Sequence, residues 1–488
     1  MLLHFYLKDG ILSKTPNSTK MTAMGSNRKY QMDMCHGSLW SQIFRFSLPL
    51  MGTNIMTLMF HAADLIVLGQ FAPDSVRVAA TAAVGATTAL HTLLLIFFSG
   101  FSAGVNSVTA RYIGAKDYVN VSRTVHTSVA LGVYGGVVFT LIGVLFSRTA
   151  LQLMGTPPDV LDKATIYLQI YSIGLPFTVL YLIGSAILRA VGDTRRPLIF
   201  IIFAGVVNVL LNLFFVVVCK MDAAGVALAT KIASVISAWL VIRALRQAEG
   251  PVKLVFKKIR FHASNLKEVL WIGVPAGIQG ALYTVSNIFI QSSVNSLGSA
   301  AMAGNAACQS LEGMASIASG SFYQTSMSFA GQNLGGKKYK RVVKSIWVCL
   351  FYTTVFSLLA GGIFLAGGRM FLSFYNPDPT VISWGMERLV IMMSCYALCG
   401  IMDTISGSLR GLGHSVKPTI TTIMGACGLR IFWVLAIFPH YKTLRCLMIS
   451  YPVSWIVTGL VNGIILYFVC RQMLMKASRE RNGFLTLR

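Results

Sequence analysis

The sequence predicts an all-α polytopic membrane protein, with twelve transmembrane helices in two six-helix lobes related by a pseudo-two-fold axis along the membrane normal. Three observations predict this fold: the composition, a series of long apolar segments, and an internal repeat. Of the 488 residues, 55% are hydrophobic and only 12% are charged, and the mean hydropathy is +0.67. A soluble protein of this size does not need so much apolar surface. The chain is therefore expected to lie mostly within a bilayer.

Twelve apolar segments are long enough to cross the hydrocarbon core of a bilayer, which takes about 20 helical residues. The expected spans are 43–71, 79–104, 125–146, 164–187, 198–218, 222–246, 268–295, 301–330, 345–367, 383–408, 418–438 and 444–470. An even number of spans places both ends of the chain on the same side of the membrane.

The net charge of +25 reflects basic residues in alternate loops. These residues are Arg111, Lys116 and Arg123, then Arg189, Arg195 and Arg196, then the basic residues of 243–267, then those of 337–344, then Arg410 and Lys417, and finally those of the C-terminal tail. This is the positive-inside pattern of membrane proteins. It predicts a plasma (inner) membrane protein with both termini in the cytoplasm, and it argues against nucleic acid as a partner.

The chain repeats itself. The segment LRAVGDTRRPLI, from Leu188, matches LRGLGHSVKPTI, from Leu409. Their glycines, Gly192 and Gly413, are 221 residues apart, like the arginines and prolines of the same two segments. Each repeat holds six spans, so the two halves have the same orientation, and the substrate path is expected at their interface.

The repeat divides the chain into two lobes and three polar segments. These are a polar N-terminal segment 1–42, an N-lobe 43–247, a cytoplasmic basic linker 248–267, a C-lobe 268–470, and a cytoplasmic basic tail 471–488. No cleavable signal peptide is expected, because the first 40 residues lack a sustained apolar core. The nine cysteines have neither disulfide nor metal-ligand spacing.

One carboxylate, Asp64, lies deep in the first span. An ionised Asp at the bilayer centre costs about 2.5–3.5 kcal/mol, so such a residue usually faces a cavity and serves function. The structural alternative is a cap or ion pair near the end of the helix. By helical rise, Asp64, Asn212 and Thr230 all lie about 10 Å from the outer ends of their spans. Asn208 lies one turn from Asn212 on the same face. These four polar groups can therefore meet at one level of the N-lobe.

The motifs together resemble the multidrug and toxic compound extrusion (MATE) transporters, in particular their bacterial branch. They are LPLMGTNIMTLMFHAADLIVLGQF from Leu48, ILRAVGDTRRPL from Ile187, AAGVALAT from Ala223, SFAGQNLGG from Ser328, SLRGLG from Ser408 and ACGLRIFW from Ala426. The resemblance covers about residues 30–476. It implies cation-coupled export by alternating access between the two lobes.

In that family, a cation site is made by an Asp of the first helix, an Asn and an Asp four apart on the fifth, and a Thr of the sixth. Asp64, Asn208 and Thr230 match this set, but Asn212 stands where many members have the second acid. No like-charge neighbour then favours a proton on Asp64. Asparagine oxygens still suit Na⁺, a hard cation. H⁺ and Na⁺ both remain open as the coupling ion, and no other cofactor or metal is expected.

A basic residue, Lys231, adjoins this set and is a further departure from the family pattern. It either neutralises Asp64 or directs its ammonium group elsewhere. The second lobe has different groups. Glu312 lies near mid-membrane and is a candidate for binding a cationic substrate or a proton, and His91 occupies its place in the first repeat.

The remaining candidates for the substrate cleft are polar groups of the C-lobe. Asn287 and Gln291 flank the position equivalent to Asp64, which is Ile290. Asp403 precedes Arg410 by seven residues, so that an ion pair and a substrate contact are both open. Arg430 either contacts an anionic substrate or bonds helix carbonyls.

The leading hypothesis is an antiporter that exchanges H⁺ or Na⁺ for organic, cationic amphipathic compounds. The alternative is a flippase for a lipid-linked precursor, which a strongly basic cleft would favour. An enzyme is not expected, because neither a paired-Asp motif nor a Ser/His arrangement nor a G-x-x-x-x-G-K-[ST] phosphate loop occurs. The expected partners are small organic substrates and the lipid bilayer, and a monomer is expected.

Overall fold

A computed structural model describes residues 31–71, 74–221 and 223–485. These residues form helices joined by turns, with no strand among them. The helices of the N-lobe are α1 (Leu39–Phe71), α2 (Asp74–Gly114), α3 (Tyr118–Leu153), α4 (Pro158–Ile173), α5 (Leu175–Ala190), α6 (Arg195–Leu213) with the π-helical turn η3 (Phe214–Val218), and α7 (Ala223–Arg246). Two short 3₁₀ turns follow in the linker, η4 (Gly250–Val252) and η5 (Phe256–Lys258).

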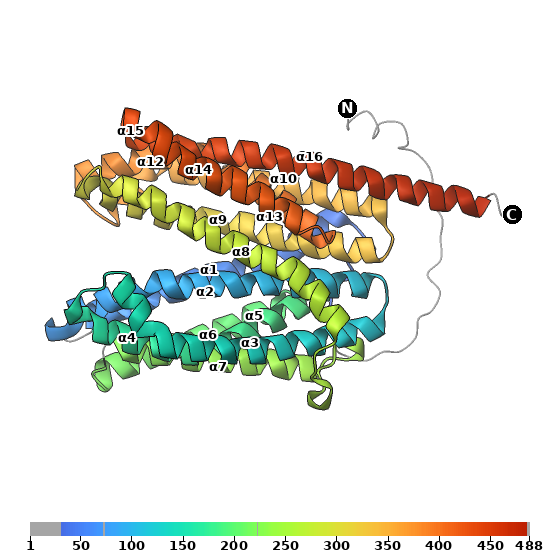
Figure 1. The fold of residues 1–488 in the computed structure, drawn as a ribbon, viewed down its shortest axis with the longest axis horizontal. Helices are drawn as coiled ribbons and strands as arrows, with labels where there is room; N and C mark the ends of the chain where they lie inside the picture. Colours follow the sequence, from blue (N-terminus) through green and yellow to red (C-terminus); the bar gives the residue numbers. More distant parts are fainter. Residues whose placement is uncertain (1–30, 72–73, 222, 486–488) are drawn as a thin grey trace.

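The C-lobe repeats this order. Its helices are α8 (Ala263–Asn295), α9 (Ser299–Gly335), α10 (Tyr339–Ala366), α11 (Gly368–Ser373), α12 (Pro379–Gly411), α13 (Val416–Thr422), η6 (Ile423–Gly428), α14 (Leu429–Phe432), η7 (Trp433–Ile437), α15 (Phe438–Tyr441) and α16 (Leu444–Leu485). Figure 1 shows the two lobes one above the other, with the linker and the C-terminal end of α16 on the right. We call this end of the bundle the basic end.

The structure confirms the predicted spans. Ten described helices are individually long and apolar enough to cross a membrane, and α4 with α5 brings the number to eleven. Helix α9 covers the remaining predicted span, 301–330, but it is rich in Ser, Gly and Asn and is less apolar. It packs between α10 and α12 and also contacts α1 and α2 of the other lobe. Because it faces protein on most sides, it does not need an apolar surface throughout.

The fourth span is broken, whereas the sequence suggested one continuous helix over 164–187. Helices α4 and α5 meet at Gly174 with a bend of 44°. Pro176 lies just after the break, and its missing N–H and ring disrupt the helical hydrogen bonding there. The equivalent span of the C-lobe, α12, is unbroken. The bend therefore distinguishes the two lobes, although they share a sequence pattern.

The internal repeat is visible in the backbone of the turns at the basic end. Lys116 and Lys337, which are repeat equivalents, have φ of 57° and 54°. The equivalent glycines Gly192 and Gly413 have φ of 93° and 89°. Left-handed backbone favours glycine, so these two positions are constrained by their turns. The Arg-x-x-Gly segments are thus turns that end spans.

The lobes contact each other closely through α2 and α8. Gly100 and Gly104 on α2 lie against Gly273 and Gly277 on α8, and a Cβ at Gly100 would overlap the backbone of Gly277. This pair of G-x-x-x-G patterns lets the two backbones approach directly. The first half of α8 consequently packs into the apolar core of the N-lobe, as Figure 1 shows at the right. Reciprocally, the first half of α1 packs against α9 and α10.

Further contacts join the lobes at the basic end. Asn106 and Ser328 exchange hydrogen bonds, and the Gln332 amide donates to the carbonyl of Ala190 at 2.5 Å. The segment before α1 is held by the C-lobe, because Arg341 donates to the carbonyls of residues 34, 36 and 37. Helix α1 begins at Leu39, within the predicted polar segment 1–42, and α16 extends to Leu485, into the predicted tail.

Candidate functional site

A carboxylate and three neutral polar side chains meet in the N-lobe. The Asp64 carboxylate accepts a hydrogen bond from the Asn212 amide at 2.5 Å. The Thr230 hydroxyl lies 3.2 Å from its other oxygen and 2.9 Å from the Val226 carbonyl, so its one proton is shared between these two acceptors. Asn208 donates to the Thr230 oxygen at 3.2 Å. The four residues come from α1, α6 and α7, as their depths in the sequence suggested. We call them the Asp64 cluster.

Helix geometry explains this convergence. Asn208 and Asn212 are one turn apart on α6, and both side chains are buried. Helix α6 changes to π-helical winding at Phe214, two residues after Asn212. Single π turns are frequent at functional sites because they redirect side chains locally. The side-chain amide oxygen of Asn212 is buried and has no hydrogen-bond partner among the described residues.

The atoms of the Asp64 cluster that could bind a cation are oxygens. It offers two carboxylate oxygens, two amide oxygens and one hydroxyl, which are the ligand types that hard cations prefer. Asn208 and Asn212 can turn either amide atom inward, because their orientation follows the hydrogen-bond network. No group of three or more His, Cys, Asp or Glu suited to a metal occurs in the described part of the chain. The cluster therefore suits Na⁺ or a proton better than a transition metal.

Lys231 lies next to the cluster but does not pair with Asp64. Its ammonium nitrogen lies 3.0 Å from the centroid of the Tyr171 ring, and the side chain is buried. Its methylene groups pack on Gly174, where a Cβ would overlap them. The break between α4 and α5 thus makes room for this lysine. A cation on a ring face gains about 2 kcal/mol when it is desolvated. The lysine neither neutralises Asp64 by direct contact nor leaves the protein interior.

His91 lies on α2 and contacts the same tyrosine as Lys231. Its ring stacks on Tyr171 with a centroid distance of 4.7 Å. Its Nδ1 is buried and makes no hydrogen bond within the described residues. His91 therefore groups with Lys231 and Tyr171 in the N-lobe, whereas Glu312, its repeat equivalent, pairs with Arg388.

In the C-lobe, Glu312 is not a free carboxylate. Arg388 of α12 donates to both of its oxygens, at 2.6 and 2.8 Å, and the arginine side chain is 2% exposed. Asn305 accepts a hydrogen bond from the same guanidinium. This bidentate pair compensates the charge that we expected to attract a cation. Glu312 and Arg388 together are one neutral unit.

Two further candidates for the substrate cleft lie on α8. Gln291 accepts a hydrogen bond from Asn305 at 2.9 Å, so it is linked through Asn305 to Arg388. Asn287 accepts a weaker bond from the Tyr451 hydroxyl at 3.5 Å. These polar groups of α8 thus join the network around Glu312, whereas Ile290 between them is buried.

Asp403 does not form the ion pair with Arg410 that one interpretation of the sequence expected. Arg410 instead donates to Gln279 at 2.7 Å and to the Tyr323 hydroxyl. The described neighbour of the Asp403 carboxylate is the Cys399 thiol, with a sulfur–oxygen distance of 4.0 Å. Asp403 is therefore a partly buried carboxylate without a described cationic partner.

Arg430 is enclosed by aromatic rings. Its guanidinium carbon lies 4.1 Å from the centroid of Tyr451, 5.2 Å from that of Tyr283 and 6.0 Å from that of Trp455. It donates to the Ser454 hydroxyl at 2.9 Å, and one of its terminal nitrogens has no partner among the described residues. The expected bonds to helix carbonyls are replaced by ring faces and one hydroxyl.

Sequence reasoning missed Arg388 and Tyr171. Arg388 lies within the predicted span 383–408, and an arginine inside a span is by itself a signal for a buried partner. Tyr171 carried no such signal, because a tyrosine in an apolar span has many ordinary roles.

The comparisons with known proteins agree with these two lobes. The family model described as MatE matches residues 49–214 and 275–434, one match in each lobe. The curated relatives include the probable multidrug resistance protein YoeA of Bacillus subtilis, which is 26% identical over 433 residues, or 87% of this chain and 92% of the relative. They also include the FAD transporter of Shewanella oneidensis, 23% identical over 452 residues, or 90% of this chain and 96% of the relative.

Solved structures share the fold. A MOP superfamily transporter from Pyrococcus furiosus, for which reverse polarity of the binding pocket suggests a different function, matches with a TM-score of 0.84 and 19% identity. The match covers 90% of this chain and 98% of that one. A multidrug resistance MATE family transporter in an outward-facing conformation also matches with a TM-score of 0.84, at 19% identity, and covers 91% of this chain and 98% of that one.

Proposed function

This chain belongs to the MatE family of multidrug efflux transporters, and we propose that it is a cation-coupled antiporter that exports organic, cationic amphipathic compounds in exchange for H⁺ or Na⁺. It would act as a monomer in the plasma (inner) membrane, with both termini in the cytoplasm. The two-lobe fold and the multi-pass helices are those of a transporter. The observation that carries the coupling proposal is the Asp64 cluster.

Charge compensation supports coupling at Asp64. The carboxylate accepts two hydrogen bonds from neutral groups and has no ion-pair partner among the described residues. A carboxylate inside a membrane-spanning bundle is stabilised when a cation joins it. A proton or Na⁺ that enters the cluster would supply that charge. Glu312 already has its counter-charge in Arg388.

The lobe contacts suggest how binding would drive export. The lobes are closed against each other at the basic end, through α2 and α8 and through the Gln332 amide. With the basic end in the cytoplasm, this arrangement is closed to the cytoplasm. Cation binding at Asp64 would favour one lobe arrangement and lower the affinity for substrate there. The inward movement of one charge releases about 2.3 kcal/mol per 100 mV, so no nucleotide is required.

A flippase for a lipid-linked precursor is the second candidate, and the C-lobe favours it. Arg388, Arg410 and Arg430 are all buried there, and the acids of α9 and α12 are Glu312, Glu387 and Asp403. The unpartnered nitrogen of Arg430 would suit an anionic group such as a phosphate. The intramembrane charges are nevertheless mixed, and Asp64 of the N-lobe has no ion-pair partner among the described residues, which favours the cation-coupled exporter.

The proposed function is tested in reconstituted vesicles, with a pH gradient and a Na⁺ gradient imposed separately. Efflux of a cationic dye is measured for the wild type, for Asp64→Asn, and for Asp162→Asn as a control. Asp162 is an exposed aspartate of the same lobe, paired with Arg148 at the surface. We expect one gradient to drive efflux, Asp64→Asn to abolish it, and the control to keep it.

Other outcomes separate the alternatives. Undiminished gradient-driven efflux by Asp64→Asn would place coupling outside the cluster and contradict the proposal. If neither gradient drives dye efflux by the properly inserted wild type, the same vesicles are assayed for translocation of a fluorescent lipid-linked phosphate. Translocation of that lipid, reduced by Arg430→Gln, would support the flippase.

A further inference from the structure

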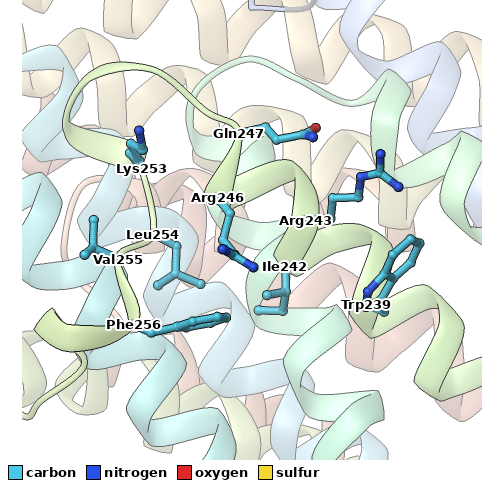
Figure 2. Close-up of a pocket in the computed structure, with 9 residues that line it drawn as sticks. All are labelled: Trp239, Ile242, Arg243, Arg246, Gln247, Lys253, Leu254, Val255 and Phe256. Carbon is cyan, nitrogen blue, oxygen red and sulfur yellow. The ribbon is translucent and has the colours of Figure 1, made fainter.

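A cavity of about 670 Å³ lies at the basic end of the N-lobe, outside the Asp64 cluster. It is formed between the last turns of α7 and residues 250–258 of the linker, which we call the linker strap. Figure 2 shows the side chains around it, with Arg246 directed from α7 toward Phe256 of the linker strap. The lining residues that matter here are Trp239, Arg243, Arg246, Lys253 and Phe256.

The wall opposite α7 is held in place by hydrogen bonds. The N–H of Leu254 donates to the carbonyl of Leu245 at 2.9 Å, and the N–H of Val255 donates to the His126 ring at 3.1 Å. Leu254 is 2% exposed, so it anchors the linker strap in the apolar core of the N-lobe. The cavity is therefore preformed, and a ligand would not have to order this wall.

The cavity is strongly basic. Arg243, Arg246 and Lys253 line it, and Glu249, the one acid in the sequence between residues 243 and 258, does not. Neither arginine has an ion pair with an acid in the part of the chain that the structure describes. Three cations that line one cavity, with no acid among the lining residues, repel each other, and an anion in the cavity would reduce that repulsion.

Aromatic rings hold both guanidinium groups. The Arg243 guanidinium carbon lies 5.2 Å from the centroid of Trp239, and that of Arg246 lies 4.8 Å from the centroid of Phe256. Stacking on a ring limits the positions of the guanidinium but leaves its N–H groups free to donate. Both guanidinium groups come from α7, one beside Trp239 and the other beside Phe256 of the linker strap, so each can donate to the oxygens of a phosphate in the cavity.

The position of Trp239 indicates where this phosphate comes from. Trp239 is 55% exposed and lies within the membrane-crossing helix α7, two turns before its basic end. Val235, one turn deeper on the same helix, is also exposed and apolar. Exposed tryptophan near the end of a span marks the headgroup level of the bilayer. The cavity thus opens where phospholipid headgroups lie, with an apolar helix surface below it.

We propose that this cavity binds the phosphate of an anionic phospholipid headgroup, held by Arg243, Arg246 and Lys253, with its acyl chains along Trp239 and Val235 of α7. Basic pockets at the ends of membrane helices are suited to such headgroups. The bound lipid attaches the N-lobe end of the linker to the membrane surface. The other lobe can then move while this point stays fixed relative to the bilayer.

Native mass spectrometry of the purified full chain tests this proposal with phosphatidylglycerol and phosphatidylcholine as probes. The variant R243Q/R246Q is compared with K257Q/K258Q, which removes two exposed charges from the same linker strap that do not line the cavity. Each charged hydrogen bond is worth at least about 1.5 kcal/mol, or about tenfold in affinity. We expect the wild type to retain one phosphatidylglycerol, R243Q/R246Q to bind it at least about tenfold more weakly, and K257Q/K258Q to retain it.

An equal loss of bound phosphatidylglycerol in the two variants would show that the lipid is attracted only by the overall positive charge of the linker strap, and it would overturn the proposal. Displacement of the lipid by an equal concentration of inorganic phosphate would show a site for soluble anions and would overturn it as well. A second readout needs no arginine substitution. The fluorescence of Trp239 is obtained as the difference between the wild type and Trp239→Phe. Brominated phosphatidylglycerol should quench this fluorescence more strongly than brominated phosphatidylcholine does. Equal quenching by the two lipids would contradict the proposal.

Discussion

The two lobes share a repeat and a fold, but Asp64 of the N-lobe and Glu312 of the C-lobe have opposite surroundings. In the N-lobe, Asp64 is surrounded by amides and a hydroxyl, and the nearby Lys231 is held on a tyrosine ring instead of on the acid. In the C-lobe, Glu312 is clamped by Arg388. Asp64 has no ion-pair partner among the described residues, whereas Glu312 has one in Arg388.

The repeat shows how this difference arises from few substitutions. Glu312 and Arg388 correspond, at an offset of 221 residues, to His91 and Tyr167 of the N-lobe. Thr230 corresponds to Tyr451, one of the rings that enclose Arg430. Asp64, in the first span, has the apolar Ile290 as its counterpart. The order of spans is therefore shared between the halves, apart from the bend at Gly174, while the polar groups differ between them. We infer that coupling needs only one lobe.

The largest expected effect comes from breaking the C-lobe pair. Arg388→Met leaves Glu312 buried without its counter-charge, which typically costs about 3–5 kcal/mol of folding free energy. We expect a large drop in the thermal unfolding midpoint of the detergent-purified protein. Adding Glu312→Gln to this variant should recover much of the loss, because no uncompensated charge then remains.

A surface pair provides the control for this comparison. Arg148 and Asp162 form an ion pair at 2.6 Å, but their side chains are 55% and 73% exposed. Exposed pairs contribute up to about 1 kcal/mol, so Arg148→Gln should change the unfolding midpoint little. If Arg388→Met were as mild as Arg148→Gln, the C-lobe pair would not be the fixed element described here.

An intermediate effect is expected at Lys231. A protonated Lys231 would oppose the entry of a cation into the Asp64 cluster, and a neighbouring charge at a partly buried site is worth on the order of 1–2 kcal/mol. Lys231→Met should therefore lower the half-saturating concentration of the coupling cation about tenfold. Transport is measured against cation concentration, with Lys442→Met in the C-lobe as the control. A higher half-saturating concentration would instead make Lys231 part of the coupling machinery.

A smaller effect is expected from the hydroxyl of the cluster. Thr230→Val keeps the shape of the side chain but removes its bond to Asp64, which is worth about 1 kcal/mol. The half-saturating cation concentration should rise about fivefold in the same assay. Ser234→Ala is the matched control, because that hydroxyl bonds only the Thr230 carbonyl one turn earlier. An unchanged value in Thr230→Val would exclude its oxygen as a cation ligand.

The sequence was sufficient to predict the spans, the repeat and the convergence of the residues of the Asp64 cluster. Apolar length gives the spans, and helical rise gives the depth of each polar group, so that Asp64, Asn212 and Thr230 could be placed at one level. Depth does not give the rotation of a helix about its axis. The pairing of Glu312 with Arg388, 76 residues later, depends on which faces of α9 and α12 meet. The position of Lys231 depends on the bend at Gly174, which only packing reveals.

The most direct test of the central claim is cation binding to the purified protein, without transport. Binding of Na⁺, or uptake of protons, is measured for the wild type, Asp64→Asn and Asp403→Asn. Asp403 is the C-lobe carboxylate without a described cationic partner, so it is the strongest competitor for this role. We predict that Asp64→Asn loses one bound cation and that Asp403→Asn keeps it. Binding that survives in Asp64→Asn and disappears in Asp403→Asn would move the coupling site to the C-lobe and contradict the account.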